Sequence, residues 1–548
     1  MKLQTAATAM SSITPAAIEE KLTVASPLSI INTLPGANFG SSDAYGLSIR
    51  NFLSIRGLDQ TEIGYLVDNM PPVSITNYFP YAETWADNEN VADLTIIQGN
   101  SRLQDPIINA SGGELIMTIR SPKNQFGGKL SASAGSYEGS RIFGAIDTGY
   151  IGETGAKAFA SYSHSTAHNF VGPGRNNRDH VDLRIEKDWS DNARSTLYAA
   201  YDDLYNARLP FFNLAQANDG INNDRLDQYM FSSSYVPGVT TQYYKLNVSL
   251  SKGFLVSNNN DFKVSDNVTL HVIPYYRFYQ NKSSSQSRLN PTSIFSGNTK
   301  VVAAFDPSVL QGGGLVGAGA GRYDQNIFGV NNYVEAKLSS TNSLSFGYWF
   351  QQSLLDEYQG FQLVDQQGNL PGYNRSTALK TTSGAFISGL DYSVRTTNHQ
   401  VFIGDTQSFL DDRLSVTLGF KYLIWKTHVN NYAIGAPLTS STSWTRAMPR
   451  ILASFKFDDR NQIYANITTN ARMPIPKTTY VNAYNISSGA ATAVGNSSIK
   501  PEYTVSSQAG YRFSGPINID ATAFLMKLKN HQITGTSFVN GFLLSTLT

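Results

Sequence analysis

From about residue 128 onward the sequence alternates between apolar and polar residues in a series of short runs. In residues 244–250 and 414–422, for example, every second residue is apolar and the residues between them are mostly polar. A period of two places the two kinds of side chain on opposite faces of a β-strand. Short polar turns, such as residues 189–192, alternate with long irregular connections, such as residues 203–240. Strands with two unlike faces, joined by tight turns at one end and long loops at the other, are typical of a transmembrane β-barrel.

The composition is compatible with a barrel that is surrounded by lipid. Charged residues make up 15% of the 548 residues, against roughly 25% in an average soluble protein. The chain also carries 30 Tyr and 29 Phe, and aromatic residues form girdles at both rims of membrane barrels. A tyrosine-rich soluble β protein would have the same composition, so composition alone leaves that alternative open. No apolar run reaches the length of about 18 residues that indicates a transmembrane helix.

Cysteine content and charge exclude several classes of function. The chain has no cysteine, which excludes disulfides, thiolate catalysis and cysteine-ligated metal sites. The net charge is +1 and no basic stripe is present, so we expect no binding to nucleic acid. The first residues lack the apolar segment of a secretory signal, although a barrel of this kind must be exported. We therefore expect the true N-terminus to be missing, and also the C-terminus, because residues 543–548 stop in mid-pattern.

The first 122 residues differ from the rest of the chain. Thr14 and Ser26 each precede a proline, which predicts two helix starts. Short strand-like segments follow, so we predict an α+β domain over residues 1–122 and a barrel over residues 123–548. We place about 16 to 17 antiparallel strands in the second domain, whereas plugged outer-membrane transporters have about 22. The predicted fold is therefore a large but incomplete transmembrane β-barrel with an N-terminal α+β domain inside its lumen.

The N-terminal domain carries two segments with specific motifs. Residues 54–72 read SIRGLDQTEIGYLVDNMPP, and residues 91–122 read VADLTIIQGNSRLQDPIINASGGELIMTIRSP. They resemble the plug domain of TonB-dependent outer-membrane receptors, which has Ile-Arg-Gly, Val-Asp-Gly-x-Pro and Ile-Glu-Val-x-x-Gly segments and then a Gly-Gly pair. The residues that match these motifs are Arg56, Gly57, Asp68, Gly99, Gly112 and Gly113.

Two positions depart from the family pattern, and two barrel segments extend the resemblance. Asn69 replaces the usual glycine, but asparagine tolerates left-handed turn geometry better than most residues. Ile97 and Gln98 lie where the family commonly has an acidic residue. Residues 499–502, which read IKPE, and residues 411–422 resemble segments of the family's barrel. The resemblance therefore covers nearly the whole chain.

The resemblance implies a transport function. Within the family, the loops and the plug look most like those of ferric-siderophore receptors. The implied partners are a ferric siderophore, TonB with ExbB and ExbD at the periplasmic side, and the lipid of the bacterial outer membrane. We expect a monomer that is not an enzyme and has no cofactor, with iron carried only within the siderophore. No TonB box is recognisable before Thr14, so we expect this chain alone to bind its ligand without transporting it.

The plug segment after Asp68 is the expected ligand site. Aromatic rings there would stack on a catecholate or pack against a hydroxamate chelate, and a cation would pair with its negative charge. The alternative is that these rings anchor the plug against the barrel loops. The candidate ligand-binding residues are Arg50, Tyr78, Phe79, Tyr81 and Trp85.

The motif residues of the plug have structural roles in this interpretation. Arg56 is expected to contact the barrel wall or to form an ion pair with Asp59 or Glu62. The four motif glycines would allow tight turns where the plug backbone runs close to the wall, although ordinary turns would also explain each of them.

Other functions are weighed against this one. TonB-dependent uptake of another large ligand, such as vitamin B12, an oligosaccharide or another metal chelate, stays open. A barrel-borne hydrolase would need a Ser/His/acid group, and no Gly-x-Ser-x-Gly elbow occurs. The plug motifs argue against a general porin. We expect the glycine-rich residues 312–321 in a long loop and no metal site built by the protein, because His164 and His168 lie in a strand.

Overall fold

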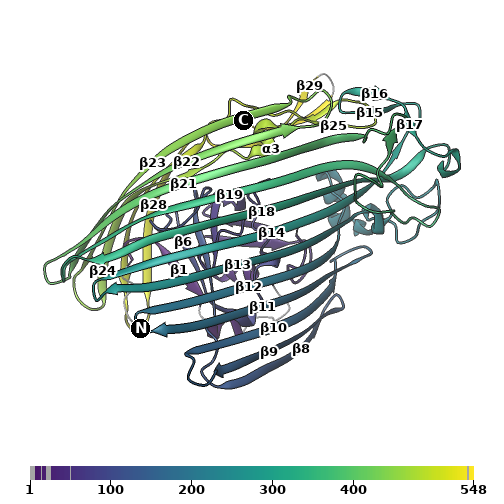
Figure 1. Cartoon of the computed structure of the whole chain (residues 1–548). Helices are drawn as coiled ribbons and strands as arrows, with labels where there is room; N and C mark the ends of the chain where they lie inside the picture. The colour runs from purple at the N-terminus through teal and green to yellow at the C-terminus, as the bar shows by residue number, and fades with distance from the viewer. Residues whose placement is uncertain (1–5, 14, 20–25, 50, 540–541, 548) are drawn as a thin grey trace.

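A computed structural model describes residues 6–13, 15–19, 26–49, 51–539 and 542–547 of the chain. It consists of one large curved β-sheet and a smaller plug that lies within the curve of the sheet (Figure 1). None of the described helices is both long and apolar enough to cross a membrane.

The large sheet has 15 strands, and each strand pairs with its neighbours in an antiparallel arrangement. Chain order and spatial order coincide, as in an up-and-down barrel, and the edge strands β8 and β28 do not pair with each other within the described residues. In chain order the strands are β8 (Phe126–Gly135), β9 (Gly139–Tyr150), β10 (Ala156–His168), β11 (Arg175–Ser190), β12 (Ala193–Ala207), β13 (Val248–Ser265), β14 (Val268–Leu289), β18 (Leu315–Lys337), β19 (Asn342–Leu363), β21 (Ser388–Phe409), β22 (Leu414–Asn431), β23 (Thr439–Lys456), β24 (Asn461–Arg472), β27 (Glu502–Phe513) and β28 (Ile519–Lys529).

The sheet confirms a large antiparallel barrel-type fold, with one or two strands fewer than expected. The last two strands, β29 (Thr534–Val539) and β30 (Phe542–Leu547), do not extend the sheet beyond β28. They pair instead with β25 (Ala483–Tyr484) and β26 (Ala491–Ala493), which lie in a long connection.

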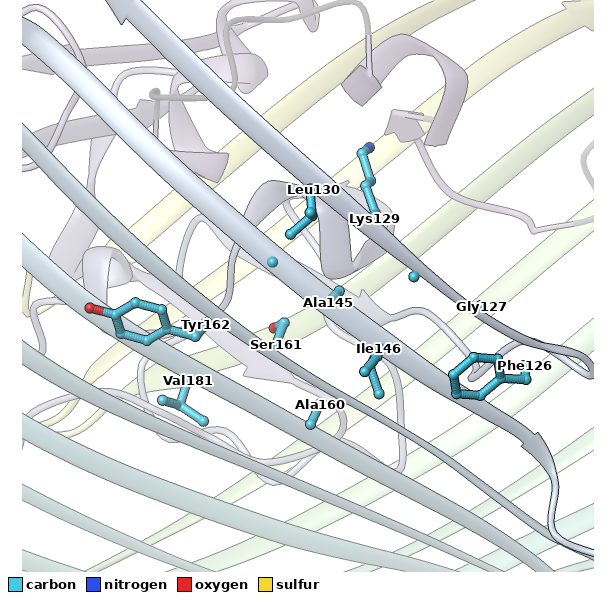
Figure 2. Close-up of a pocket in the computed structure, with 12 residues that line it drawn as sticks. Phe126, Gly127, Lys129, Leu130, Ala145, Ile146, Ala160, Ser161, Tyr162 and Val181 are labelled. Carbon is cyan, nitrogen blue, oxygen red and sulfur yellow. The ribbon is translucent and has the colours of Figure 1, made fainter.

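The two faces of the sheet carry different side chains. On β22, Leu418 is 54% exposed on the outer face, whereas Lys421 is 2% exposed and its ammonium donates to the plug carbonyl of Arg102 at 2.6 Å. Figure 2 shows the outer face at β8 to β11, where side chains including those of Leu130 and Ile146 line a shallow apolar groove of about 840 Å³. The apolar outer face and the polar inner face confirm the period-two pattern.

One predicted strand begins later than its sequence pattern suggested. Residues 244–246 form a 3-10 helix, and β13 begins only at Val248. Leu246 is buried together with Tyr243, Val316 and Val364 beneath the connection, so it does not face lipid. A period of two over three or four residues does not distinguish a strand from a tight helical turn, which explains the error.

The two ends of the sheet differ, as the alternation of turns and loops predicted. Short hairpin turns lie at one end, and the long connections 208–247, 290–314, 364–387 and 473–501 lie at the other (Figure 1). Strands β14, β18 and β19 have 22, 23 and 22 residues, although about 9–11 residues suffice to cross a membrane. We expected the glycine-rich residues 312–321 in a loop, but β18 begins at Leu315, so the glycines of residues 317–321 lie inside this strand.

The long connections contain short elements of their own. These are α2 (Leu214–Asn222), η5 (Leu226–Tyr229), η6 (Tyr244–Leu246), β15 (Ile294–Ser296), β16 (Thr299–Val301), β17 (Ala303–Ala304), η7 (Pro307–Val309), β20 (Lys380–Thr381) and α3 (Pro476–Tyr480).

The plug contains two small sheets. The four-stranded sheet has the order β1 (Met10–Ile13), β6 (Val91–Gln98), β7 (Gly113–Ile119) and β5 (Ile63–Val67), and only β5 and β7 are parallel. The three-stranded sheet consists of β2 (Ala37–Ser41), β3 (Asn51–Ile55) and β4 (Leu58–Asp59).

Short helices complete the plug. They are α1 (Pro15–Glu19) and the 3-10 helices η1 (Pro27–Thr33), η2 (Gln60–Glu62), η3 (Ala82–Thr84) and η4 (Asn88–Asn90). The Ser26 hydroxyl accepts from the Leu28 N–H at 3.4 Å and caps η1, as the Ser-Pro pair predicted. Thr14, the other predicted cap, lies outside the described residues.

Candidate functional site

A left-handed turn after β5 redirects the plug chain toward the long-loop end of the barrel. Asp68 and Asn69 have φ values of +46° and +70°, so Asn69 adopts the geometry that its glycine-like role requires. The Asp68 carboxylate lies 2.9 Å from Arg184 on β11, which fixes the turn to the wall. The chain then forms residues 74–85, which we call the apical segment.

The apical segment is held by the wall and by a long connection. Gln325 of β18 accepts through Oε1 from the Ile75 N–H and from the Ser74 hydroxyl, both at 3.2 Å. The Tyr198 hydroxyl of β12 donates to the Trp85 carbonyl at 2.9 Å. The Tyr78 hydroxyl donates to the carbonyl of Pro474 at 3.5 Å, so the connection after β24 reaches the plug.

Two of the predicted ligand-binding residues are enclosed. Tyr78 and Trp85 have no exposed surface. The Trp85 indole donates to the Pro80 carbonyl at 3.0 Å, and its ring centroid lies 5.6 Å from that of Tyr65. In this conformation Tyr78 and Trp85 support the apical segment and offer no side-chain surface to a ligand.

Phe79 and Tyr81 are only partly buried. Their rings meet edge to face at 6.1 Å, and Tyr81 stacks on Tyr279 of β14 at 5.2 Å. Tyr323 of β18 extends the aromatic group, with its ring 5.5 Å from that of Tyr279. Arg50, the predicted electrostatic partner, lies outside the described residues.

A lysine of α3 ties the long connection to the wall beside the apical segment. The Lys477 ammonium lies 2.5 Å from the Glu357 carboxylate of β19. Tyr392 of β21 donates to the same carboxylate. This ion pair holds the connection after β24 over the plug in the present conformation.

Arg208 lies near the long-loop end of the barrel. The Asn206 side-chain amide, two residues earlier, donates to the plug carbonyl of Leu47 at 3.0 Å and therefore points inward. Since side chains two positions apart in a strand lie on the same face, Arg208 also points inward. One guanidinium nitrogen donates to the Ser284 carbonyl of β14 at 3.1 Å, and within the described chain Arg208 takes part in no ion pair.

Ion pairs with arginines of the wall fix the plug below the apical segment. Arg178 Nη1 lies 2.6 Å from Asp87 Oδ1, and Arg141 lies 3.1 Å from Asp87 and 2.6 Å from Glu89. Burial alone would raise the pKa of the Asp87 carboxyl, but Arg178, a nearby histidine and Arg141 hold it well below its usual range. We call Asp87, Glu89, Arg141 and Arg178 the plug–wall ion network.

Glu83 in η3 is a buried carboxyl group, and neither of its side-chain oxygens has a hydrogen-bond partner among the residues that the structure describes. Burial raises its pKa to about 8. The Arg277 guanidinium of β14 is also buried, and two of its nitrogens have no partner among the described residues. Glu83 is thus held mainly as the neutral acid at pH 7.

The state of Glu83 makes the stability of the plug depend on pH. Its folded-state pKa lies above the unfolded value of roughly 4.3, so its contribution is complete at acidic pH and is lost as pH rises through about 8. We expect the free energy of plug unfolding, relative to that of Glu83→Gln, to fall between about pH 5 and pH 8. Urea unfolding followed by hydrogen exchange of plug amides measures this difference. A pH-independent difference, or an equal pH effect in the exposed control Glu153→Gln, would contradict the prediction.

The motif residues of the plug divide into wall contacts and internal contacts. The Arg56 guanidinium lies 3.9 Å from the ring centroid of Phe524 on β28. In the described part of the chain it forms no ion pair with Asp59, which accepts from the Thr61 N–H at 2.7 Å, or with Glu62, which accepts from the Asp59 N–H at 2.9 Å. Arg56 is therefore a contact to the wall.

The motif glycines also differ in their surroundings. A Cβ on Gly99 would lie 2.8 Å from the Ser506 hydroxyl of β27, so this glycine allows close contact with the wall. A Cβ on Gly112 would lie 3.2 Å from Leu58, and one on Gly113 would lie 2.2 Å from the Ile97 carbonyl, both inside the plug. Gly57 has a φ of +81° and open space around it.

Sequence reasoning missed the polar groups that complete the site. Arg208, Lys477 and Glu357 come from three separate parts of the barrel, and no local spacing connects them. For Arg208 one signal was present, because it continues the inward-facing period of β12 by two residues.

Two family models match the chain. The model described as "TonB dependent receptor-like, beta-barrel" matches residues 132–545, and the "TonB-dependent Receptor Plug Domain" model matches residues 2–113. A search of curated proteins by sequence finds no match.

Solved structures share the fold at low sequence identity. The ferric citrate transporter FecA in its unliganded form has a TM-score of 0.69 and 13% identity, and the match covers 95% of this chain and 70% of FecA. The ferric yersiniabactin uptake receptor FyuA from Yersinia pestis has a TM-score of 0.63 and 13% identity, and the match covers 96% of this chain and 73% of FyuA. The copper transporter OprC has a TM-score of 0.68 and 14% identity, and the match covers 100% of this chain and 75% of OprC.

The barrel model covers well over half of the chain, and the plug model covers most of the segment before it. The strand pattern, the enclosed plug and both matches lead to one conclusion. The chain belongs to the family of TonB-dependent receptors.

Proposed function

We propose that this protein binds a ferric siderophore at the long-loop end of its barrel and imports it across the bacterial outer membrane. Family membership and the barrel fold imply the outer membrane and support a role for TonB as the partner. ExbB and ExbD would energise TonB, and the iron would enter only within its chelate. The similar folds of a ferric citrate transporter and a ferric yersiniabactin receptor support this ligand class.

The observation that carries the proposal is the combination of partly buried aromatic rings with a guanidinium group, that of Arg208, which forms no ion pair among the described residues. Phe79 and Tyr81 are the partly buried aromatic residues of the apical segment, and their rings contact each other and Tyr279. Arg208 bonds to β14 at Ser284, five residues from the Tyr279 on which Tyr81 stacks, toward the long-loop end. Five strand residues span about 16 Å, so the rings and the guanidinium group would contact different parts of one large anionic iron chelate, the rings by stacking and Arg208 by charge pairing.

The direct test is binding to single, defined ferric chelates. We expect the full chain in detergent to bind at least one ferric catecholate, hydroxamate or carboxylate siderophore, with quenching of its intrinsic fluorescence. Arg208→Gln should weaken that binding by roughly tenfold or more, because it removes a charge-assisted hydrogen bond. Tyr81→Ala should weaken it by a few-fold, because aromatic contacts contribute about 0.5–1.5 kcal/mol.

Arg225→Gln is the matched control, since Arg225 is a connection arginine that lies 3.9 Å from Asp219. It should leave the affinity unchanged. Equal losses in Arg208→Gln and Arg225→Gln would mean that only the general positive field matters. Binding of vitamin B12, an oligosaccharide or a copper chelate, and of no ferric siderophore, would overturn the proposed ligand class within the same family.

A further inference from the structure

Two carboxylates and a histidine meet where the plug touches the wall, outside the apical segment. Glu62 is the last residue of η2, Glu502 is the first residue of β27, and His531 follows β28. One ligand atom of each residue lies within 4.8 Å of the other two. The three residues are far apart in the chain, so only the packing of plug and wall brings them together.

The three side chains lie close enough together for one small divalent ion to reach all of them. His531 Nε2 lies 2.7 Å from Glu62 Oε1 and 3.9 Å from Glu502 Oε2. Ligand atoms that each lie about 2.1 Å from a tetrahedral zinc ion are about 3.4 Å apart, so a bound ion would replace the hydrogen bond between His531 and Glu62 and separate these two atoms by about 0.7 Å. Imidazole and carboxylate together are ligands that zinc and similar transition ions accept.

A second observation concerns the buried carboxylate of Glu502. Its side chain has no exposed surface; Oε2 accepts from the Gln532 N–H at 3.1 Å, and Oε1 has no hydrogen-bond partner among the described residues. A buried carboxylate with an unsatisfied oxygen is costly unless a proton or a cation neutralises it. His531 is 40% exposed, so an ion has a route from solvent to the cluster.

One arginine lies beside the cluster. Arg472 Nη1 is 3.9 Å from Glu502 Oε2, but Nη2 donates to the Thr61 hydroxyl at 2.6 Å and Nη1 donates to the Gln532 carbonyl at 3.3 Å. Two carboxylates and one guanidinium leave a net charge of −1 when His531 is neutral. The site therefore still attracts a divalent cation.

A second cluster also consists of two carboxylates and one histidine, but one of its carboxylates is already paired with arginines. Asp87, His180 and Asp182 also lie close together. There Arg178 and Arg141 already pair with Asp87 at 2.6 Å and 3.1 Å. Because guanidinium groups fill the positions around the carboxylate, this second cluster is an ion-pair network and not a metal site.

We propose that Glu62, Glu502 and His531 bind one divalent transition ion of the zinc type, which joins the plug to the barrel wall. This site revises the expectation that the protein builds no metal site. It goes beyond the proposed function and is independent of the imported ligand, because it lies outside the apical segment. A bound ion would link three segments and stabilise the docked plug.

Cobalt(II) is the probe, because its visible absorption reports ligation by imidazole and carboxylate. We expect the full chain in detergent to bind one Co²⁺, displaceable by Zn²⁺. His531→Ala and the shape-matched Glu502→Gln should each weaken binding by at least about tenfold. Zn²⁺ should also raise the unfolding temperature of the unaltered protein and not that of Glu502→Gln.

His428→Ala is the control, because His428 bonds to the Ser441 hydroxyl at 2.7 Å, outside the cluster. Its Co²⁺ affinity should equal that of the unaltered protein. The proposal is overturned if the unaltered protein binds Co²⁺ no more tightly than His531→Ala, or if His428→Ala loses as much affinity as His531→Ala. Retained heat-modifiable migration on gels shows that each variant is folded.

Discussion

Replacing Arg178 with methionine should destabilise the docked plug by about 3–5 kcal/mol, because the substitution leaves a buried carboxylate without its main partner. Arg178 is buried, lies 2.6 Å from Asp87 Oδ1 and donates through Nε to the Glu83 carbonyl at 2.7 Å. Both bonds join the wall strand β11 to the plug. Their loss should release residues 82–90 from the wall before the barrel itself unfolds.

Hydrogen exchange of plug amides in increasing urea measures this free energy. The matched control is Arg175→Met on the same strand, since Arg175 pairs with Glu138 at 3.1 Å on the surface. Exposed pairs contribute less than about 1 kcal/mol, so the control should change little. Adding Asp87→Asn to Arg178→Met should cost less than the sum of the two single changes, because no buried charge is then left unpaired. Equal effects of Arg178→Met and Arg175→Met would refute the role assigned to the plug–wall ion network.

Replacing Gly113 with alanine should prevent the plug from folding, with an expected cost above about 4 kcal/mol. Gly113 has a φ of +117°, and an added Cβ would lie 2.2 Å from the Ile97 carbonyl and 2.8 Å from the Gly99 nitrogen. These atoms belong to the backbone, so a change of side-chain rotamer cannot relieve the clash. Strand β7 is also paired on both sides, with β6 and β5, so the clash cannot be relieved by moving an edge.

Gly57→Ala separates this clash from the general cost of a left-handed backbone. Gly57 has a φ of +81°, and no atom lies within 4 Å of an added Cβ. It should therefore lose only about 1–2 kcal/mol. The measurement is the hydrogen-exchange protection of the β7 amides. Near-native protection in Gly113→Ala would contradict the prediction, because it would mean that the plug sheet accommodates the added Cβ.

Local patterns in the sequence predicted a large part of the fold. The alternation around Leu418 and Lys421 predicted an outer and an inner face, and Ser26 before a proline predicted a helix start. The same reasoning failed where a pattern was short or weak. Leu246 lies in a helical turn, and the glycines of residues 317–321 lie in a strand although glycine disfavours strands.

The candidate site was predicted only in part, since burial depends on contacts from elsewhere in the chain. Four aromatic residues of the plug were candidates from the sequence, but only Phe79 and Tyr81 are partly exposed, whereas Tyr78 and Trp85 are fully buried. Tyr78 is covered near Pro474, which lies 396 residues away in the sequence. No local sequence pattern around Tyr78 predicts this contact.

The sequence by itself determined the strand period, the order of plug and barrel, and the turns that need glycine or asparagine. These features depend on residues within a few positions of each other, where backbone sterics and side-chain alternation act. Only the tertiary structure decided which aromatic residues of the plug stay partly exposed, that Arg208 has no acidic partner in the described part of the chain, and that Glu62 meets Glu502 and His531. Such contacts join residues from distant parts of the chain, and they exist only once the plug is enclosed by the wall.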